Sequence, residues 1–531
     1  MLRPAPLCLA CALTLFGAVL DAAPTEVATG EVVELPPFVV TGFVIGPPWR
    51  YAEIPGYEIL SQCSDDETRE IVAALWRGPQ LVLPPALRPH FSLPMTVVLF
   101  NQPPLTQAGN PQTFGSVQRP AEMGRHWTNL IKRSLDDRES YALNLWPGSF
   151  NQTSAFRFDI CTLLRRRAPA TPLWLKEGLF GGFGLYREGV YWRPGEEERI
   201  VPVATWCSLE ETRQARNLVD IARKRLSPGG RELAPSSLAP FIPALPDLIE
   251  RTPPAADDPS LDRWAAGTAL FVRWGIYGRR PEEVGQFWRF VERTCAEPAT
   301  EALFQECFGR SYASVHAELS WYLAVAVREE ATAPPDGMLP LPRFNLRAAT
   351  VAEIARLRGE WERMEAAALA PRFPDLAKQY REQAARTFAR GYKTKEGRED
   401  PRLQASLGLL ALETEQFTVA AQFLEAAVAR QVPGPLPYLE AARLRWAIGR
   451  LDDSAVLSPE ARPGVIALLL QAELQGPPLA SVYLLLARAV AQAGPPTPDQ
   501  AAALERGRRF FPRRVDVQQL IQTALAPPAG R

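Results

Sequence analysis

The stretch FDICTLLRRRAPATPLWLKEGLFGGFG, residues 158–184, decides how the first half of the chain is interpreted. An apolar segment with an acidic residue near its start predicts a helix at about 153–167. Its last residues, Arg165 to Arg167, are most simply a solvated helix end, which the negative end of the helix dipole stabilises. The segment that begins at Leu173 predicts a second helix. Two consecutive helices joined by an arginine-rich turn are therefore expected here.

The second helix begins with the motif Trp-Leu-x-Glu-Gly-Leu at residues 174–179. This motif resembles a segment of peptidase-MA-like (gluzincin-type) zinc metallopeptidases. In that family, the two histidines of a preceding His-Glu-x-x-His bind zinc and its Glu acts as the base on a zinc-bound water. A third ligand, usually Glu, comes from the helix that follows. The resemblance covers about residues 51–327, and it implies a gluzincin-like fold with Glu177 at the position of the third ligand.

The zinc motif itself would fall on residues 158–162, and there the chain departs from the family. Phe158 and Thr162 stand in place of the two histidines: phenylalanine has no lone pair, and a neutral hydroxyl is a poor ligand beside imidazole. Asp159 keeps a carboxylate but is one methylene shorter than Glu. Only Glu177 remains, whereas a catalytic zinc site needs about three protein ligands. We therefore predict a degenerate site with no catalytic residue, no bound metal and no other cofactor.

Two alternatives to this interpretation stay open. The histidines of the chain, His90, His126 and His316, lie outside the window and share no helical spacing, so a zinc site would need distant ligands. A Ser-His-Asp hydrolase would lack the Gly-x-Ser-x-Gly nucleophile elbow. Glu177 also has a structural interpretation, because a Glu in the first turn of a helix is favoured by the helix dipole.

The residues around the motif predict an α+β domain at 51–330. Strands are expected at 57–62, 93–101 and 139–148. A helix is expected at 65–82 with Asp65 or Asp66 as its N-cap, and further helices at 261–278, 281–295 and 301–327. Because strands come first and helices follow, we expect the helices to gather on one side of the sheet.

A linker at 331–345 precedes residues 346–531, which have the alanine-rich amphipathic pattern of an all-α domain. Gly408, Ala420 and Ala427 are small residues where paired helices would touch, and Ala442 follows Gly408 by 34 residues. A period of 34 with small residues at helix contacts resembles tetratricopeptide repeats. We therefore expect a tetratricopeptide-like helical-repeat domain, with an irregular helical bundle as the alternative.

The charge balance and the N-terminus limit the classes of partner and location. Lys plus Arg and Asp plus Glu both number 59, which gives no support for nucleic-acid binding. Residues 1–23 predict a signal peptide, because a positive start precedes an apolar run and small residues. The mature chain is then expected to be periplasmic or secreted, with no membrane span; an uncleaved N-terminal anchor is the alternative. In the proline-rich linker at 24–50, ELPPFVVTG resembles a segment that follows the signal peptide in exported proteins of the Verrucomicrobia.

Five cysteines lie beyond the signal peptide: Cys63, Cys161, Cys207, Cys295 and Cys307. They could form one or two disulfides or serve as small buried hydrophobic residues. For the whole chain we predict an exported pseudo-peptidase that binds a protein or peptide through an inactive cleft and helical repeats. The alternatives are a peptidase or other hydrolase with an unrecognised active site, and a structural envelope protein in which both domains are spacers.

Overall fold

The computed structural model of the protein describes residues 48–82, 93–100, 130–135, 138–144, 171–182, 186–191, 199–206, 239–255, 258–277, 281–326, 331–332, 341–371, 373–450 and 456–526. These residues form an α+β structure with a six-stranded sheet, a three-stranded sheet and a larger number of helices. Nothing in this part of the chain is a helix long and apolar enough to cross a membrane.

The larger sheet has the strand order β4-β5-β3-β2-β1-β9. Its strands are β1 (Arg50–Ile54), β2 (Tyr57–Ser61), β3 (Met95–Phe100), β4 (Leu130–Leu135), β5 (Arg138–Asn144) and β9 (Arg347–Ala348). Strands β2, β3 and β5 are parallel, and β1, β4 and β9 pair antiparallel with their neighbours. The strands predicted at 57–62, 93–101 and 139–148 are confirmed as β2, β3 and β5.

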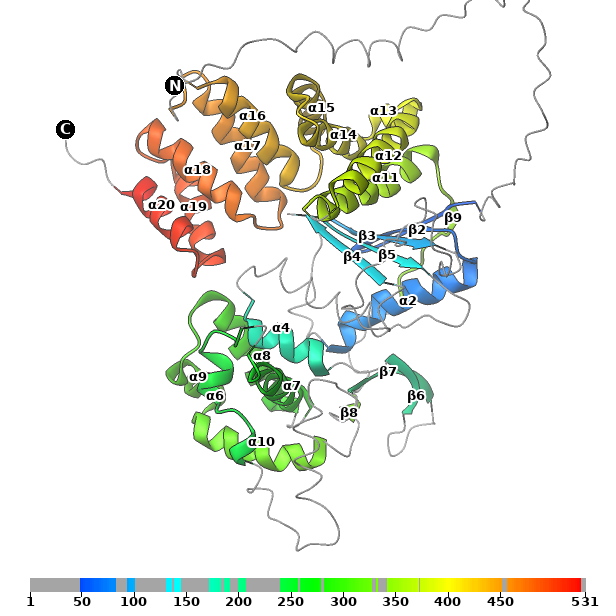
Figure 1. Cartoon of the computed structure of the whole chain (residues 1–531). Helices are drawn as coiled ribbons and strands as arrows, with labels where there is room; N and C mark the ends of the chain where they lie inside the picture. Colours follow the sequence, from blue (N-terminus) through cyan, green and yellow to red (C-terminus); the bar gives the residue numbers. More distant parts are fainter. Residues whose placement is uncertain are drawn as a thin grey trace, which may run out of the picture. The chain divides into compact units, whose positions relative to one another are not determined.

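Both faces of this sheet are covered. Because side chains alternate along a strand, Val97 of β3 joins a core that includes helix α2 (Asp65–Val82). Its neighbour Val98 instead packs with Trp361 of helix α11 (Val351–Leu369). All residues of β3 are buried, as expected for a strand between two layers. The helices of the domain predicted at 51–330 share one core on one face of the sheet, as expected. The other face is covered by α11, which belongs to the segment predicted as a separate domain (Figure 1).

Helix α2 has the predicted bounds but a different N-cap. Ser64 precedes the helix, and its Oγ accepts a hydrogen bond from the backbone N–H of Glu67 (3.3 Å). The Glu67 carboxylate accepts in return from the backbone N–H of Ser64 (3.0 Å), which completes a capping box. The predicted caps, Asp65 and Asp66, are the first residues of the helix itself.

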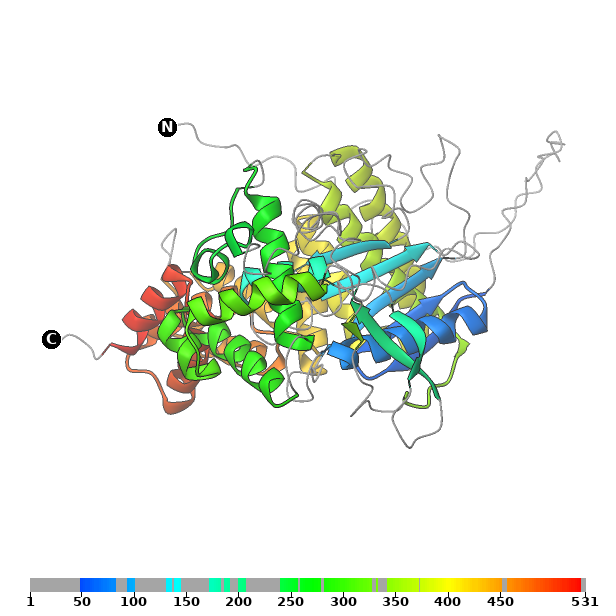
Figure 2. The same cartoon turned by 90° about the horizontal axis from the view of Figure 1, so that it is seen from below.

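The first core is completed by helices that surround α7 (Figures 1 and 2). They are α4 (Leu173–Gly182), α6 (Leu245–Ile249), α7 (Leu261–Tyr277), α8 (Pro281–Ala296), α9 (Glu301–Phe308) and α10 (Tyr312–Ala326). Helix α7 is buried at every residue from Trp264 to Ile276. The helices predicted at 261–278 and 281–295 are confirmed. The helical segment predicted at 301–327 consists of two helices, α9 and α10, because Gly309 adopts a left-handed conformation (φ 66°) and ends α9.

A smaller sheet combines β6 (Tyr186–Tyr191), β7 (Arg199–Trp206) and β8 (Ala331–Thr332) in that order. None of these strands is predicted by the sequence pattern. Strand β8 lies within the segment predicted as a linker, at 331–345.

The remaining helices form a succession in which neighbours along the chain pack together. They are α11 (Val351–Leu369), α12 (Pro374–Tyr392), α13 (Lys395–Glu399), α14 (Pro401–Glu413), α15 (Phe417–Ala429), α16 (Leu436–Ile448), α17 (Arg462–Gln475), α18 (Ala480–Ala493), α19 (Pro498–Phe510) and α20 (Val515–Leu525). Helix α16 begins 35 residues after α14, but α17 begins 45 residues after α15. The first helices of the two successive pairs, α14 and α16, are therefore close to the predicted period of 34 residues apart. The second helices, α15 and α17, are farther apart than that period.

The small residues singled out by the repeat pattern lie at helix contacts. A Cβ on Gly408 of α14 would come within 2.7 Å of Leu424 Cγ on α15. Ala420, Ala427 and Ala442 are fully buried. The spacing thus marks positions at which two helices approach closely, and this much of the expectation for residues 346–531 is confirmed.

Candidate functional site

The Trp-Leu-x-Glu-Gly-Leu segment forms the first half of α4, which packs against α7. Trp174, Leu175 and Leu179 are buried in the first core. Gly178 lies so close to α7 that a Cβ there would approach Thr268 O within 2.7 Å and Val272 Cγ2 within 2.4 Å. Four of the five residues that define the motif therefore serve the contact between these two helices.

Glu177 is half-buried on the same helix. Helix α4 begins at Leu173 and has no acidic residue in its first turn, so the explanation of Glu177 by the helix dipole is wrong. The other three positions of the degenerate site, Phe158, Asp159 and Thr162, lie outside the described residues.

The histidines do not form a site with Glu177 in the part of the chain that the structure describes. His316 is half-buried on α10, and its Nε2 lies 3.1 Å from the carbonyl oxygen of Ile242. His90 and His126 lie outside the described residues. Across the described ranges, no cluster of three or more His, Cys, Asp or Glu side chains could hold a metal ion.

Three of the five cysteines are described, namely Cys63, Cys295 and Cys307. Cys63 and Cys307 are buried, and burial raises the pKa of the Cys63 thiol to about 12. Both therefore stay protonated near neutral pH, which fits small buried residues rather than reactive nucleophiles. Cys161 and Cys207 lie outside the described residues.

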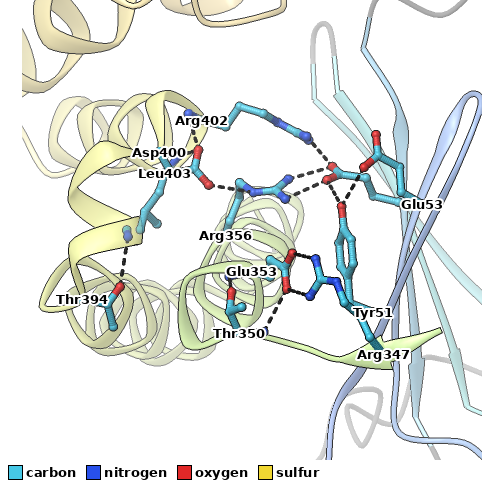
Figure 3. Close-up of polar contacts among 12 residues, drawn as sticks. Tyr51, Glu53, Arg347, Thr350, Glu353, Arg356, Thr394, Asp400, Arg402 and Leu403 are labelled. Atoms are coloured by element: carbon cyan, nitrogen blue, oxygen red, sulfur yellow. Dashed lines mark hydrogen bonds and ion pairs between the residues drawn. The ribbon is translucent and has the colours of Figure 1, made fainter. Parts of the chain in front are cut away.

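The most extensive polar constellation lies where α11 and α14 meet the sheet (Figure 3). Glu58 of β2 is buried and faces two arginines from different helices. Arg356 of α11 places Nη1 and Nη2 each 2.7 Å from the two carboxylate oxygens of Glu58. Arg402 of α14 forms a second ion pair with Glu58, and the Tyr51 hydroxyl donates to Glu58 Oε1 at 2.9 Å. The carboxylate thus has partners from the neighbouring strand β1 and from two helices.

Asp400 extends this network into the helical array. Its Oδ1 accepts hydrogen bonds from the backbone N–H groups of Arg402 (2.8 Å) and Leu403 (3.2 Å), so it is the N-cap of α14. Its other oxygen, Oδ2, lies 3.1 Å from Arg356 Nε. One carboxylate therefore fixes the start of α14 and also holds the arginine that reaches the sheet.

A second group of side chains fixes the start of α11. Thr350 and Glu353 form a capping box, in which Thr350 Oγ1 accepts from the Glu353 N–H at 3.2 Å. Arg347 of β9 pairs with the Glu353 carboxylate, Nη1 to Oε2 at 2.8 Å. The same guanidinium lies over the ring of Tyr51, 4.6 Å from its centroid, within the range of a cation–π contact.

The charges of the network suit a structural connection rather than catalysis. Burial alone would raise the pKa of Glu58, but the charges of Arg402 and Arg356 and their hydrogen bonds outweigh it and hold that pKa at about 2. Burial and the neighbouring Glu58 raise the pKa of Tyr51. Glu58 thus stays ionised and Tyr51 protonated near neutral pH, so neither is ready to transfer a proton.

Further along α11 lie more buried charges, which face α14 and α12. Arg363, which is 1% exposed, pairs with Glu360 of its own helix and with Glu413 of α14. Glu362 accepts hydrogen bonds from Thr387 Oγ1 (2.6 Å) and Gln383 Nε2 (3.2 Å) of α12. Helix α11 is therefore joined to α12 and α14 by buried hydrogen bonds and ion pairs, and to the sheet by apolar contacts as well.

The sequence pattern does not reveal the network around Glu58, because the charged residues of α11 are also typical of a solvent-exposed helix face. One signal was present: Glu58 interrupts a strand that is otherwise suited to full burial. A charge in such a strand needs a partner, since an unpaired buried carboxylate is costly. Comparisons with family models, with curated proteins and with solved structures find no match for this chain.

Proposed function

We propose that this chain is an exported pseudo-peptidase that acts as a protein- or peptide-binding module. In this proposal residues 51–330 have a gluzincin-like fold without its zinc site, and residues 346–531 form a tetratricopeptide-like array. One observation carries it. The residues of the Trp-Leu-x-Glu-Gly-Leu motif that pack α4 on α7 are retained, whereas Phe158 and Thr162 occupy the zinc-ligand positions.

The edge of the larger sheet supports binding of an extended segment. Strand β4 is the last of the described strands on one side of the larger sheet. An extended peptide could add to such an edge through main-chain hydrogen bonds, as in β-strand addition. A peptide held at this edge of a chain without zinc ligands would be bound and not cleaved.

The helical array supports a second contact with the partner. Because consecutive helices alternate in direction, the start of α15 and the end of α16 lie at the same end of the array. Phe417 and Ile448 are located there and are 59% and 79% exposed. Large exposed apolar side chains are typical contact points for a protein partner.

The first test measures zinc and cleavage on the same purified mature protein. We expect no stoichiometric zinc after stripping and reloading, and peptides from a diverse library should be retained intact, with or without a chelator. One zinc per chain together with peptide turnover, both lost in Glu177→Ala, would show that the chain is an enzyme. Gly285→Ala is the matched control, because a Cβ at Gly285 meets nothing within 4 Å.

The second test addresses the array. For a peptide selected from the library, Phe417→Ser with Ile448→Ser should weaken binding by about tenfold or more, since each removes a large apolar contact. Leu474→Ser with Val515→Ser is the control, because these side chains are as exposed (68% and 65%) but lie at the other end of the array. Equal binding by all variants would show that the exposed side chains of the helical array do not contact the peptide.

A further inference from the structure

Glu58 is the point at which two separate helices are attached to one strand. Arg356 comes from the second turn of α11 and Arg402 from the first turn of α14. Both guanidinium groups end on the carboxylate of Glu58, which is 2% exposed on β2. A displacement of either helix relative to the sheet would therefore break a buried ion pair.

Apolar contacts beside Glu58 close the same interface. Leu60 of β2 packs with Leu357 in the second turn of α11, and Val98 of β3 packs with the fully buried Trp361 one turn later. The chain enters α11 directly from the sheet: Ala348 of β9 pairs with Arg50 of β1, and Thr350 caps the helix. Helix α11 is therefore bound to the sheet along its first three turns.

We propose that Glu58 is an electrostatic lock that makes the sheet and helices α11–α14 a single cooperative unit, so that movement of α14 is transmitted to β2. This inference is independent of the function proposed above. Its physical basis is that a buried ion pair tolerates separation poorly: removing one partner leaves the other charge buried and uncompensated. Glu58 serves two cations at once, so its loss affects both helices.

The distal helices contain a comparable group that has no contact with the sheet among the described residues. Glu473 of α17, 4% exposed on its side chain, accepts from Arg506 of α19 at 2.7 Å (Nη2 to Oε2). The Tyr483 hydroxyl lies 3.5 Å from the same carboxylate. Glu473 thus matches Glu58 in burial and in the types of its partners, but it joins only α17, α18 and α19.

The test is native-state hydrogen exchange, read by mass spectrometry, on the full chain and two variants. In the unsubstituted protein, peptides from β1–β3 and from α11–α14 should share one opening rate. In Glu58→Gln both sets should exchange roughly 100-fold faster, as expected for a broken buried pair, while α17–α19 stay unchanged. Glu473→Gln should produce the converse: faster exchange in α17–α19 alone.

The inference is overturned if Glu58→Gln accelerates the sheet and leaves α11–α14 protected, or if it changes neither. Should Glu58→Gln fail to fold, Arg402→Gln removes one of the two ion pairs and keeps Arg356. This milder variant should show the same joint acceleration at a smaller size. Faster hydrogen exchange in α14 alone would also contradict the proposal.

Discussion

Glu58 shows how a single buried carboxylate can make stability depend on pH. Its pKa is held at about 2 in the folded protein, below the ordinary value of 4.5. A depressed folded-state pKa gives stability that is fully present above the unfolded value and is lost as the pH falls toward the folded value. A difference of that size corresponds to on the order of 3 kcal/mol.

We therefore predict a specific acid dependence for Glu58→Gln. Above about pH 5 the variant should unfold at a lower urea concentration than the unsubstituted protein, by a constant margin. Between about pH 4.5 and 2 the margin should shrink, because the unsubstituted protein then loses the contribution of its ionised carboxylate. Urea unfolding midpoints at a series of pH values measure this. A margin that does not change with pH would mean that Glu58 has the same pKa in the folded and the unfolded protein.

Gly178 permits a test of the close contact between α4 and α7. Gly178→Ala should destabilise the protein by about 2 kcal/mol, because the new Cβ would overlap with Val272 and the carbonyl of Thr268. Gly285→Ala is the matched control in α8, where a Cβ meets no atom within 4 Å. There the change should stabilise by about 0.5–1 kcal/mol. Equal effects in urea unfolding would contradict the close approach of the two helices.

At the scale of elements, α11 depends on its first turn. Thr350→Ala removes the side-chain oxygen that accepts from the Glu353 backbone N–H, so it should cost about 1 kcal/mol. Thr497→Ala removes an equivalent capping box from α19 and should cost a similar amount. Hydrogen exchange separates the two: the first should accelerate exchange in α11, the second in α19. If either variant accelerated hydrogen exchange in both helices, the effect of each capping box would not be confined to its own helix.

The elements that the sequence predicts are those with strong local patterns. The β-branched run of β3 and the amphipathic pattern of α2 need no information from elsewhere in the chain. Strand β9 has two residues and is defined only by its pairing with β1, so no local pattern could reveal it. Helix α11 was expected as a helix, but its burial follows from partners more than 200 residues earlier in the chain.

The candidate site also has one part that local sequence reveals and one part that it does not. The motif around Glu177 can be recognised from adjacent residues, and the structure explains its Trp, Gly and Leu positions by packing. The Glu58 network joins β2, α11 and α14, which are far apart in the sequence, so the spacing of its members carries no signal. Only the presence of Glu58 in a buried strand indicated that a cation must lie opposite it.

At the scale of the whole molecule, the predicted boundary at 331–345 does not separate two independent packing units. Strand β9 and helix α11, which follow it, complete the sheet and cover one of its faces. Val98 and Leu60 would lose their cover if the chain ended before α11, which would expose an apolar sheet face. The sheet and the first helices of the array should therefore remain together even when the chain between them is cut.

We predict this outcome for a full-length protein with a specific protease site introduced at 334–339. After complete cleavage, the two fragments should elute together in size exclusion without denaturant, because the Glu58 ion pairs and the buried Trp361 still join them. Trp361→Ala should lower the urea concentration at which they separate, since it removes a large buried side chain from the interface. The control is Phe373→Ala, which removes an aromatic side chain that is 40% exposed and should leave that concentration nearly unchanged. Fragments that separate in buffer alone would show that the sheet and the array are independent after all, and the boundary predicted from the sequence would then also be the physical one.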